Sequence, residues 1–208
     1  MRDSSSHFEG AVMAEIHGYI LAGGMSQRFG TDKARVCLNG EQLIERAVRF
    51  LDELGLPITI VANHKERFSD LDQDVIEDQP PGHGPLGGLA AALEHCPPSA
   101  WAFLICCDLK TFAPTWLEVL RAELSSSVDA VAFRGQAWQP FVALYNPALL
   151  STIRAQLEDG ELSLQKLLDK ASTQPVSLPS DWLSPPSINT PEDLDSLRSQ
   201  EPSHEHRT

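Results

Sequence analysis

The chain has 208 residues, of which 42% are hydrophobic and 22% charged, a composition typical of one globular domain with a sizeable core. Its formal net charge of −13 argues against a nucleic-acid-binding surface, and no apolar run approaches the roughly 20 residues of a membrane span. Residues 1–17 lack the basic and apolar parts of a signal peptide, and the four cysteines show no zinc-binding spacing. We therefore expect a cytoplasmic protein with reduced thiols and no membrane partner.

Composition and patterning divide the chain into three parts. Residues 1–17 are polar and are expected to form a disordered extension, residues 18–198 a single domain, and residues 199–208 a flexible tail. The first predicted strand covers residues 18–22 and leads directly into a glycine loop.

The glycine loop has the features of a nucleotide-binding loop. Gly23 and Gly24 follow the apolar strand, so backbone N–H groups can approach a ligand closely. Arg28 and Lys33 add positive charge where a polyphosphate would lie. An ordinary strand-to-helix turn would not explain this basic pair.

Spacing excludes two common nucleotide-binding loops. A Walker A loop starting at Gly24 would need glycine at Phe29, and a dinucleotide fingerprint starting at Gly23 would need glycine at Met25. The loop must therefore belong to another class of nucleotide-binding protein.

Beyond the loop, predicted helices and strands alternate. They are a helix at 41–54, a strand at 58–61, a short strand at 75–76, a helix at 86–93, a strand at 101–107, a helix at 114–124 and a strand at 128–133. This alternation predicts an α/β fold with three layers, in which helices cover both faces of a mostly parallel, Rossmann-like sheet.

Polar residues follow several predicted strands, at the edge where such sheets bind ligands. Leu21 and Ala22, Asn63, Asp78 and Asp108 all fall at or just beyond a strand end. A carboxylate there is poorly solvated unless it meets a cation, and Mg²⁺ prefers one or two carboxylates with substrate phosphates. Asp108 is therefore the candidate magnesium ligand, with capping of the helix at 114–124 as the structural alternative.

The loop resembles that of nucleotidyltransferases. Its Leu-Ala-Gly-Gly start at Leu21 and its Gly-Thr-Asp-Lys-Ala end at Ala34 are similar to the molybdenum cofactor guanylyltransferase family, MobA. The resemblance, which covers about residues 18–197, implies a fold of the nucleotide-diphospho-sugar transferase type. It also implies Mg²⁺-dependent transfer of GMP from GTP to the molybdopterin cofactor, with pyrophosphate as the second product.

The resemblance also implies roles for particular residues. Lys33 and Arg28 would hold the triphosphate, and Asp78 would help to bind the nucleotide. Asp108, which with Cys107 matches a Cys-Asp pair of the family, would bind Mg²⁺. The expected catalytic residues are thus Lys33, Asp108 and Arg28, and the expected binding residues are Leu21, Ala22, Gly23, Gly24, Lys33, Asn63, Asp78, Asp108 and Asn189. For Asn63 a turn-forming role is nearly as good an interpretation.

The later motifs depart from the family pattern. Lys110 stands where the family usually has proline, and Ser187 replaces the first of two asparagines, of which Asn189 is the second. Lys110 could contact phosphate or point to solvent. Trp138 could stack on a pterin or pack in the interior.

The motif at residues 188–194 also has a purely structural interpretation, as the start of a helix. Thr190 suits a helix N-cap, Pro191 the first helical turn, and Asp193 a capping box.

Several functions stay open on the sequence. They are a molybdopterin cytidylyltransferase, a sugar-phosphate nucleotidyltransferase, a nucleotide-binding module without turnover, and a scaffold using the acidic helices. Because cytidylyl relatives tend to begin Leu-Ala-Ala-Gly, Gly23 favours guanine. The implied partners are GTP and the molybdopterin cofactor, with molybdoenzymes or cofactor-delivery proteins as further candidates.

Overall fold

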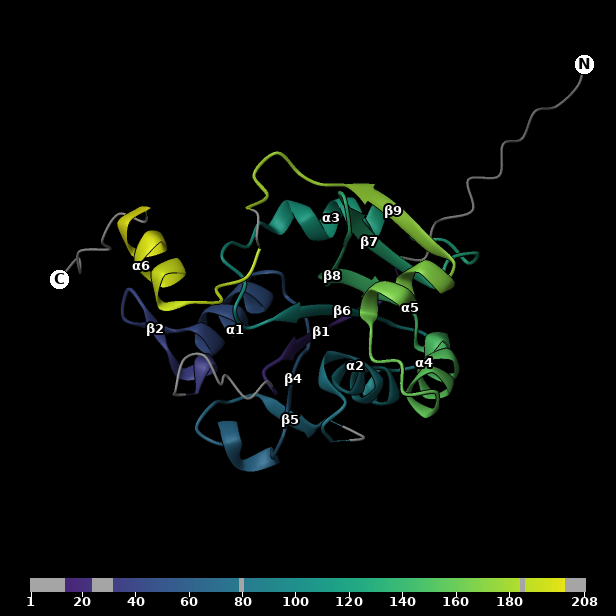
Figure 1. Cartoon of the computed structure of the whole chain (residues 1–208), viewed down its shortest axis with the longest axis horizontal. Coiled ribbons are helices and arrows are strands. Elements are labelled where there is room, and N and C mark those ends of the chain that lie inside the picture. The colour runs from purple at the N-terminus through teal and green to yellow at the C-terminus, as the bar shows by residue number, and fades with distance from the viewer. Residues whose placement is uncertain (1–13, 24–31, 79–80, 184–185, 201–208) are drawn as a thin grey trace, which may run out of the picture.

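A seven-stranded sheet with the order β5-β4-β1-β6-β8-β7-β9 forms the centre of the molecule (Figure 1). The computed structural model describes residues 14–23, 32–78, 81–183 and 186–200. The strands are β1 (Ile16–Leu21), β4 (Ile58–Ala62), β5 (Asp74–Glu77), β6 (Trp101–Cys106), β7 (Ala130–Arg134), β8 (Trp138–Tyr145) and β9 (Thr173–Ser177). Among the described strands of this sheet, β8 alone runs antiparallel to both of its neighbours, which confirms the expected α/β fold with a mostly parallel sheet.

Helices cover both faces of the sheet because the strands are apolar on both sides. In the fully buried β6, Phe103 and Ile105 face one layer and Ala102 and Leu104 the other. The first layer holds α1 (Leu43–Glu53) and α3 (Pro114–Ala122), and the second holds α2 (Gly84–His95), α4 (Leu150–Glu158) and α5 (Leu164–Lys170). Figure 1 shows α2 and α3 on opposite sides of the sheet.

A small hairpin precedes the first helix and is covered by the last one. The hairpin pairs β2 (Cys37–Leu38) with β3 (Glu41–Gln42), so α1 begins at Leu43, two residues later than predicted. The last helix, α6 (Pro191–Gln200), lies beside β2 in Figure 1. A separate apolar cluster joins these elements and consists of Leu38, Leu43, Ile188, Leu194 and Leu197.

The boundaries of the predicted domain shift at both ends. Strand β1 starts at Ile16, so Ile16 and His17, expected in the disordered extension, belong to the sheet. Helix α6 continues to Gln200, into the expected flexible tail. The sequence interpretation also lacked β8, α4, α5 and β9. Among the described residues, no helix is both long and apolar enough to cross a bilayer.

Candidate active site

The carboxyl ends of four strands meet at one edge of the sheet. Leu21 of β1 is in register with Val61 of β4 and with Cys106 of β6, and Ala62 is in register with Glu77 of β5. The residues that follow these strands are consequently neighbours, although up to 86 positions, from Ala22 to Asp108, separate them in the sequence. Ligands bind at this edge in open α/β sheets.

A cavity of about 470 Å³ opens at this edge. Every predicted site residue that the structure describes lines it, namely Leu21, Ala22, Gly23, Lys33, Asn63, Asp78, Asp108 and Asn189. Gly24 and Arg28 lie outside the described residues. Arg67, Phe141 and Ser187 also line the cavity and were not among the predicted binding residues.

Gly23 lies against the side chains of Asn63 and Asp78, and all three residues line the cavity. A Cβ atom built on Gly23 would be only 2.7 Å from Asn63 Oδ1 and 3.7 Å from Asp78 Oδ2. Within the described part of the chain, Asn63 Oδ1 and Asp78 Oδ1 are buried without a hydrogen-bond partner. Burial raises the pKa of Asp78 above its usual range. Unsatisfied buried acceptors are costly, so this acceptor pair, Asn63 and Asp78, is suited to a ligand that donates hydrogen bonds.

Lys33 and Asp108 form an ion pair on the wall of the same cavity. Lys33 begins the short 3₁₀ helix η1 (Lys33–Arg35), and its Nζ donates to Asp108 Oδ2. The two side chains are only 15% and 19% exposed. The candidate phosphate-binding cation and the candidate metal ligand thus lie in direct contact.

Arg67 is a cavity residue that the sequence interpretation missed. It belongs to the 3₁₀ helix η2 (Lys65–Phe68), four positions after Asn63. Its guanidinium contacts both the backbone of Ala22 and the side chain of Asp32. Burial raises the pKa of Asp32, but the hydrogen bonds and charge of Arg67 outweigh this effect and hold it below its usual range. A basic residue soon after a strand-end asparagine was the available signal, but its distant partners were not visible.

The loop after β6 is fixed by backbone hydrogen bonds to the C-terminal segment. The carbonyl oxygen of Asp108 accepts from the N–H of Ile188 at 2.8 Å, and the N–H of Lys110 donates to the carbonyl of Pro186 at 2.7 Å. Arg46 of α1 adds hydrogen bonds to the carbonyls of Leu109 and Lys110, at 2.7 and 2.8 Å. This network presents the Asp108 carboxylate to the cavity.

Asp108 does not cap a helix. The N-cap position of α3 is Ala113, which makes no side-chain capping hydrogen bond. The structural alternative considered for Asp108 is therefore wrong.

The two departures from the family pattern also have defined positions. Lys110 Nζ pairs with Asp193 Oδ1 at 2.7 Å, in place of the phosphate contact or solvent exposure considered from the sequence. Ser187 and Asn189 both line the cavity, and Asn189 Nδ2 donates to the carbonyl of Ser187 at 3.2 Å.

Trp138 packs in the interior and is not among the cavity-lining residues. It is 5% exposed, and its indole N–H donates to Asp169 Oδ1 at 2.8 Å. The packing interpretation of this residue is confirmed.

The start of α2 comes close to the cavity through its glycines. Gly84 has a φ of +58°, which a residue with a side chain rarely adopts. A Cβ atom on Gly88 would lie 2.9 Å from Leu21 Cδ2, so glycine there allows α2 to pack directly on the end of β1.

Comparison with known proteins identifies the family of this chain. The chain matches the family described as "MobA-like NTP transferase domain" over residues 18–176. It is 34% identical over 197 residues to "Probable molybdenum cofactor guanylyltransferase" of Opitutus terrae, a match covering 90% of this chain and 97% of the relative. A relative of the same name from Synechococcus elongatus is 34% identical over 189 residues, with 86% and 96% covered.

A solved structure has the same fold. It is the molybdopterin-guanine dinucleotide biosynthesis protein A from Archaeoglobus fulgidus, with a TM-score of 0.76 and 21% identity, over 88% of this chain and 97% of that one. The sequence matches confirm the expected family. The chain belongs to the MobA-like NTP transferase domain family, and it is a nucleotidyltransferase by descent.

Proposed function

We propose that the protein transfers GMP from GTP to the molybdopterin cofactor, forming the guanine dinucleotide cofactor and pyrophosphate. The observation that carries this proposal is one cavity lined both by the acceptor pair, Asn63 and Asp78, and by the Lys33–Asp108 ion pair. The acceptor pair suits a nucleotide base, and the ion pair suits a triphosphate. The named relatives support the same reaction.

The acceptor pair favours guanine as the base. Guanine presents an amino group and a ring N–H on one edge, and these donors match the unpaired oxygens of Asn63 and Asp78. Because the carboxylate of Asp78 only accepts hydrogen bonds when ionised, it disfavours an edge that presents acceptors. Gly23 leaves the space that such an edge would need beside Asn63.

Asp108 fits a magnesium ion that takes most of its ligands from the substrate. Among the described residues, no group of three or more His, Cys, Asp or Glu side chains forms a site held by protein alone. Mg²⁺ commonly binds through one or two carboxylates together with waters and phosphate oxygens, so a single cavity carboxylate is sufficient. When bound there, the ion would supply positive charge to the phosphates.

The protein residues then act by position and charge. A phosphate oxygen of the acceptor attacks the α-phosphorus of GTP, the bond from that phosphorus to the bridging oxygen breaks, and pyrophosphate leaves with the electron pair. Lys33 stabilises the charge that develops on pyrophosphate. No protein nucleophile is required, and burial raises the pKa of the Cys107 thiol beside Asp108 to about 12, so it stays protonated.

The molybdopterin acceptor is proposed to bind against Ser187 and Asn189 of the C-terminal segment and Phe141 of β8, all of which line the cavity. The two polar side chains there can donate hydrogen bonds to a phosphate, and Phe141 offers an apolar surface to a pterin ring. Molybdoenzymes or cofactor-delivery proteins would receive the product, and the cytoplasm is the proposed compartment.

One assay tests the proposal. The protein is incubated with the molybdopterin cofactor, Mg²⁺ and each nucleoside triphosphate in turn, and the dinucleotide and pyrophosphate are measured. We expect equal amounts of both products with GTP. Product with CTP but not GTP would refute the base assignment, and GTP binding without turnover would indicate a binding module.

A further inference from the structure

Arg67 forms hydrogen bonds to Ala22 and Asp32, two residues ten positions apart that flank the glycine loop. Its Nη1 donates to the carbonyl oxygen of Ala22 at 2.5 Å. Its Nε and Nη2 donate to the two carboxylate oxygens of Asp32, at 3.0 and 2.5 Å. Such a bidentate pair between a guanidinium and a carboxylate fixes the relative orientation of the two groups as well as their distance.

Asp32 passes this constraint on to the next residue. Its Oδ1 also accepts the backbone N–H of Ala34 at 3.1 Å, so Asp32 caps the 3₁₀ turn that begins at Lys33. Lys33 in turn pairs with Asp108 on the cavity wall. A continuous series of contacts therefore runs from Arg67 through Asp32 to the Lys33–Asp108 ion pair.

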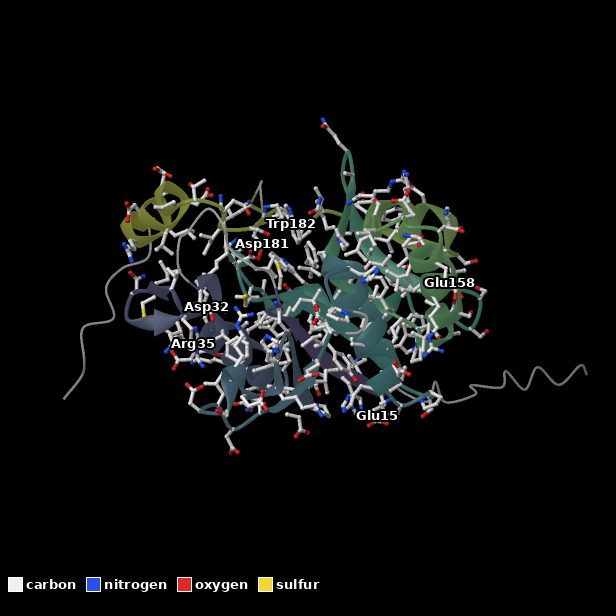
Figure 2. All side chains as sticks on the ribbon, turned by 60° about the horizontal axis from the view of Figure 1, so that its bottom comes forward. Glu15, Asp32, Arg35, Glu158, Asp181 and Trp182 are labelled. Carbon is white, nitrogen blue, oxygen red and sulfur yellow. The ribbon has the colours of Figure 1, made fainter. Side chains whose placement is uncertain are left out.

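Arg67 is itself held by its surroundings. Its guanidinium lies 5.1 Å from the ring centre of Phe68, a fully buried residue. Its carbonyl oxygen accepts from Arg35 Nη2 at 2.8 Å, and Arg35 is paired with Asp70. Figure 2 shows Asp32 and Arg35 close together on one side of the molecule, which agrees with the hydrogen bond from the Arg35 N–H to the Asp32 carbonyl.

We propose that Arg67 is a positioning residue that sets the 3₁₀ turn of Lys33 and so places the lysine ammonium for the triphosphate. Its contact with Ala22 sets the end of β1 and the Lys33 turn relative to each other. Three of the five N–H groups of the guanidinium are directed at protein acceptors, and this role requires no contact between Arg67 and the substrate. The kinetic part of this inference rests on the proposed function, whereas the placement of Lys33 does not.

The first test measures the position of Lys33 without any substrate. An amine-reactive acetylating reagent is applied to the folded protein, and modification of each lysine is followed by mass spectrometry, with the exposed Lys170 as internal reference. In Arg67→Gln, we expect Lys33 to be modified several-fold faster relative to Lys170, because its ion pair with Asp108 loosens. Asp32→Asn, which keeps the shape of the side chain, should give the same acceleration.

The matched control is Arg49→Gln. Arg49 uses the same two atoms, Nε and Nη2, to hold both oxygens of Glu41, at 2.8 and 3.0 Å, but it does not line the cavity. Its loss should leave the modification of Lys33 unchanged. If Lys33 reacts at the native rate in both Arg67→Gln and Asp32→Asn, the positioning role is refuted.

The second test asks whether Arg67 acts through Lys33 during turnover. We expect Arg67→Gln to lower kcat/KM about 10- to 100-fold with GTP in the native background, mostly through kcat, and to have little further effect in Lys33→Ala. Arg67→Lys should recover little of the lost kcat/KM, because lysine cannot make the bidentate contact with Asp32. Undiminished losses in the Lys33→Ala background would refute the coupling. Native protein that is inactive with GTP while Arg67→Gln still exposes Lys33 would refute the proposed function and leave the positioning role standing.

Discussion

Lys110 Nζ lies 2.7 Å from Asp193 Oδ1, and this ion pair joins the loop after β6 to the first turn of α6. The other oxygen of Asp193 accepts the backbone N–H groups of Asn189 and Thr190, at 2.8 and 3.0 Å. The side chains of the pair are only 13% and 21% exposed, so solvent screens them less than a surface pair. The loop that carries Asp108 is thereby tied to the segment that brings Asn189 to the cavity.

The first prediction concerns the stability of this connection in acid. The hydrogen bond from Lys110, followed by those from the backbone, lowers the pKa of Asp193 to about 2, against about 3.9 for an unfolded aspartate. A carboxyl with a lowered pKa in the folded state stabilises the fold above its unfolded pKa, and this contribution is lost as the pH falls through the folded value. In Lys110→Met, the free energy of unfolding should fall less between about pH 4 and pH 2.

Urea unfolding at a series of pH values measures this difference. Arg154→Met is the control, because its pair with Glu94 is more than half exposed on both sides and should contribute little. Identical pH profiles for native protein and Lys110→Met would show that the pair does not stabilise the fold.

The second prediction concerns Gly23→Ala. Gly23 does not need a positive φ, so alanine can adopt its backbone conformation, but the new Cβ would lie 2.7 Å from Asn63 Oδ1. We expect Asn63 to be displaced and KM for GTP to rise about tenfold, with a small change in thermal stability. Steady-state kinetics and a thermal melt measure the two effects.

Gly160→Ala is the complementary control for that substitution. Gly160 has a φ of +72° and open space around its Cβ direction, so alanine there should cost about 1 kcal/mol of stability without changing KM. An unchanged KM for GTP in Gly23→Ala would contradict the proposed place of the base.

The third prediction is that Asp78→Asn stabilises the protein while weakening its use of GTP. Burial raises the pKa of Asp78, so the folded state binds this proton more readily than the unfolded state does, and the charged form is destabilising at neutral pH. Asparagine removes that charge, so the free energy of unfolding at pH 7 should increase.

The same substitution should raise KM for GTP, because a carboxylate that accepts from guanine is lost. In the native protein, KM should rise as the pH falls through the raised pKa of Asp78, whereas Asp78→Asn should lack this dependence. The exposed Asp72→Asn serves as control and should alter neither quantity. Lower stability of Asp78→Asn at pH 7 would contradict the account.

The fourth prediction concerns the Lys33–Asp108 ion pair. Lys33→Ala should lower kcat at least about 100-fold, because the charge on departing pyrophosphate is no longer offset. The partly buried carboxylate of Asp108 also loses its partner, so stability should fall. The double variant with Asp108→Asn should be less destabilised than the sum of the single variants. The control for activity is Lys166→Ala, at an exposed lysine, which should retain full activity. If the stability losses of Lys33→Ala and Asp108→Asn add up in the double variant, the two residues are not coupled.

Local patterns predicted much of the fold and the parts of the site that follow strands. Apolar runs such as the one in β6 are buried on both faces, so they read clearly as strands, and α1 shows a clear helical period. The capping box of Thr190 and Asp193 was also predicted and is present. These features depend on residues within a few positions of one another.

Other features depend on contacts across the whole chain. Strand β8 is antiparallel and lies between β6 and β7, an order that no local pattern specifies. The partners of Arg67 at Ala22 and Asp32 and the partner of Lys110 at Asp193 are similarly remote.

The sequence by itself determined the type of fold, the glycine loop and the strand ends at which polar residues would gather, because hydrophobic period and turn chemistry are short-range properties. Only the tertiary structure decided which charged side chains pair, because pairing depends on distances and burial that arise when the sheet assembles. For that reason Asp108 could be predicted as a site residue from the sequence, whereas its contact with Lys33 and the contacts of Arg67 with Ala22 and Asp32 became visible only in the folded chain.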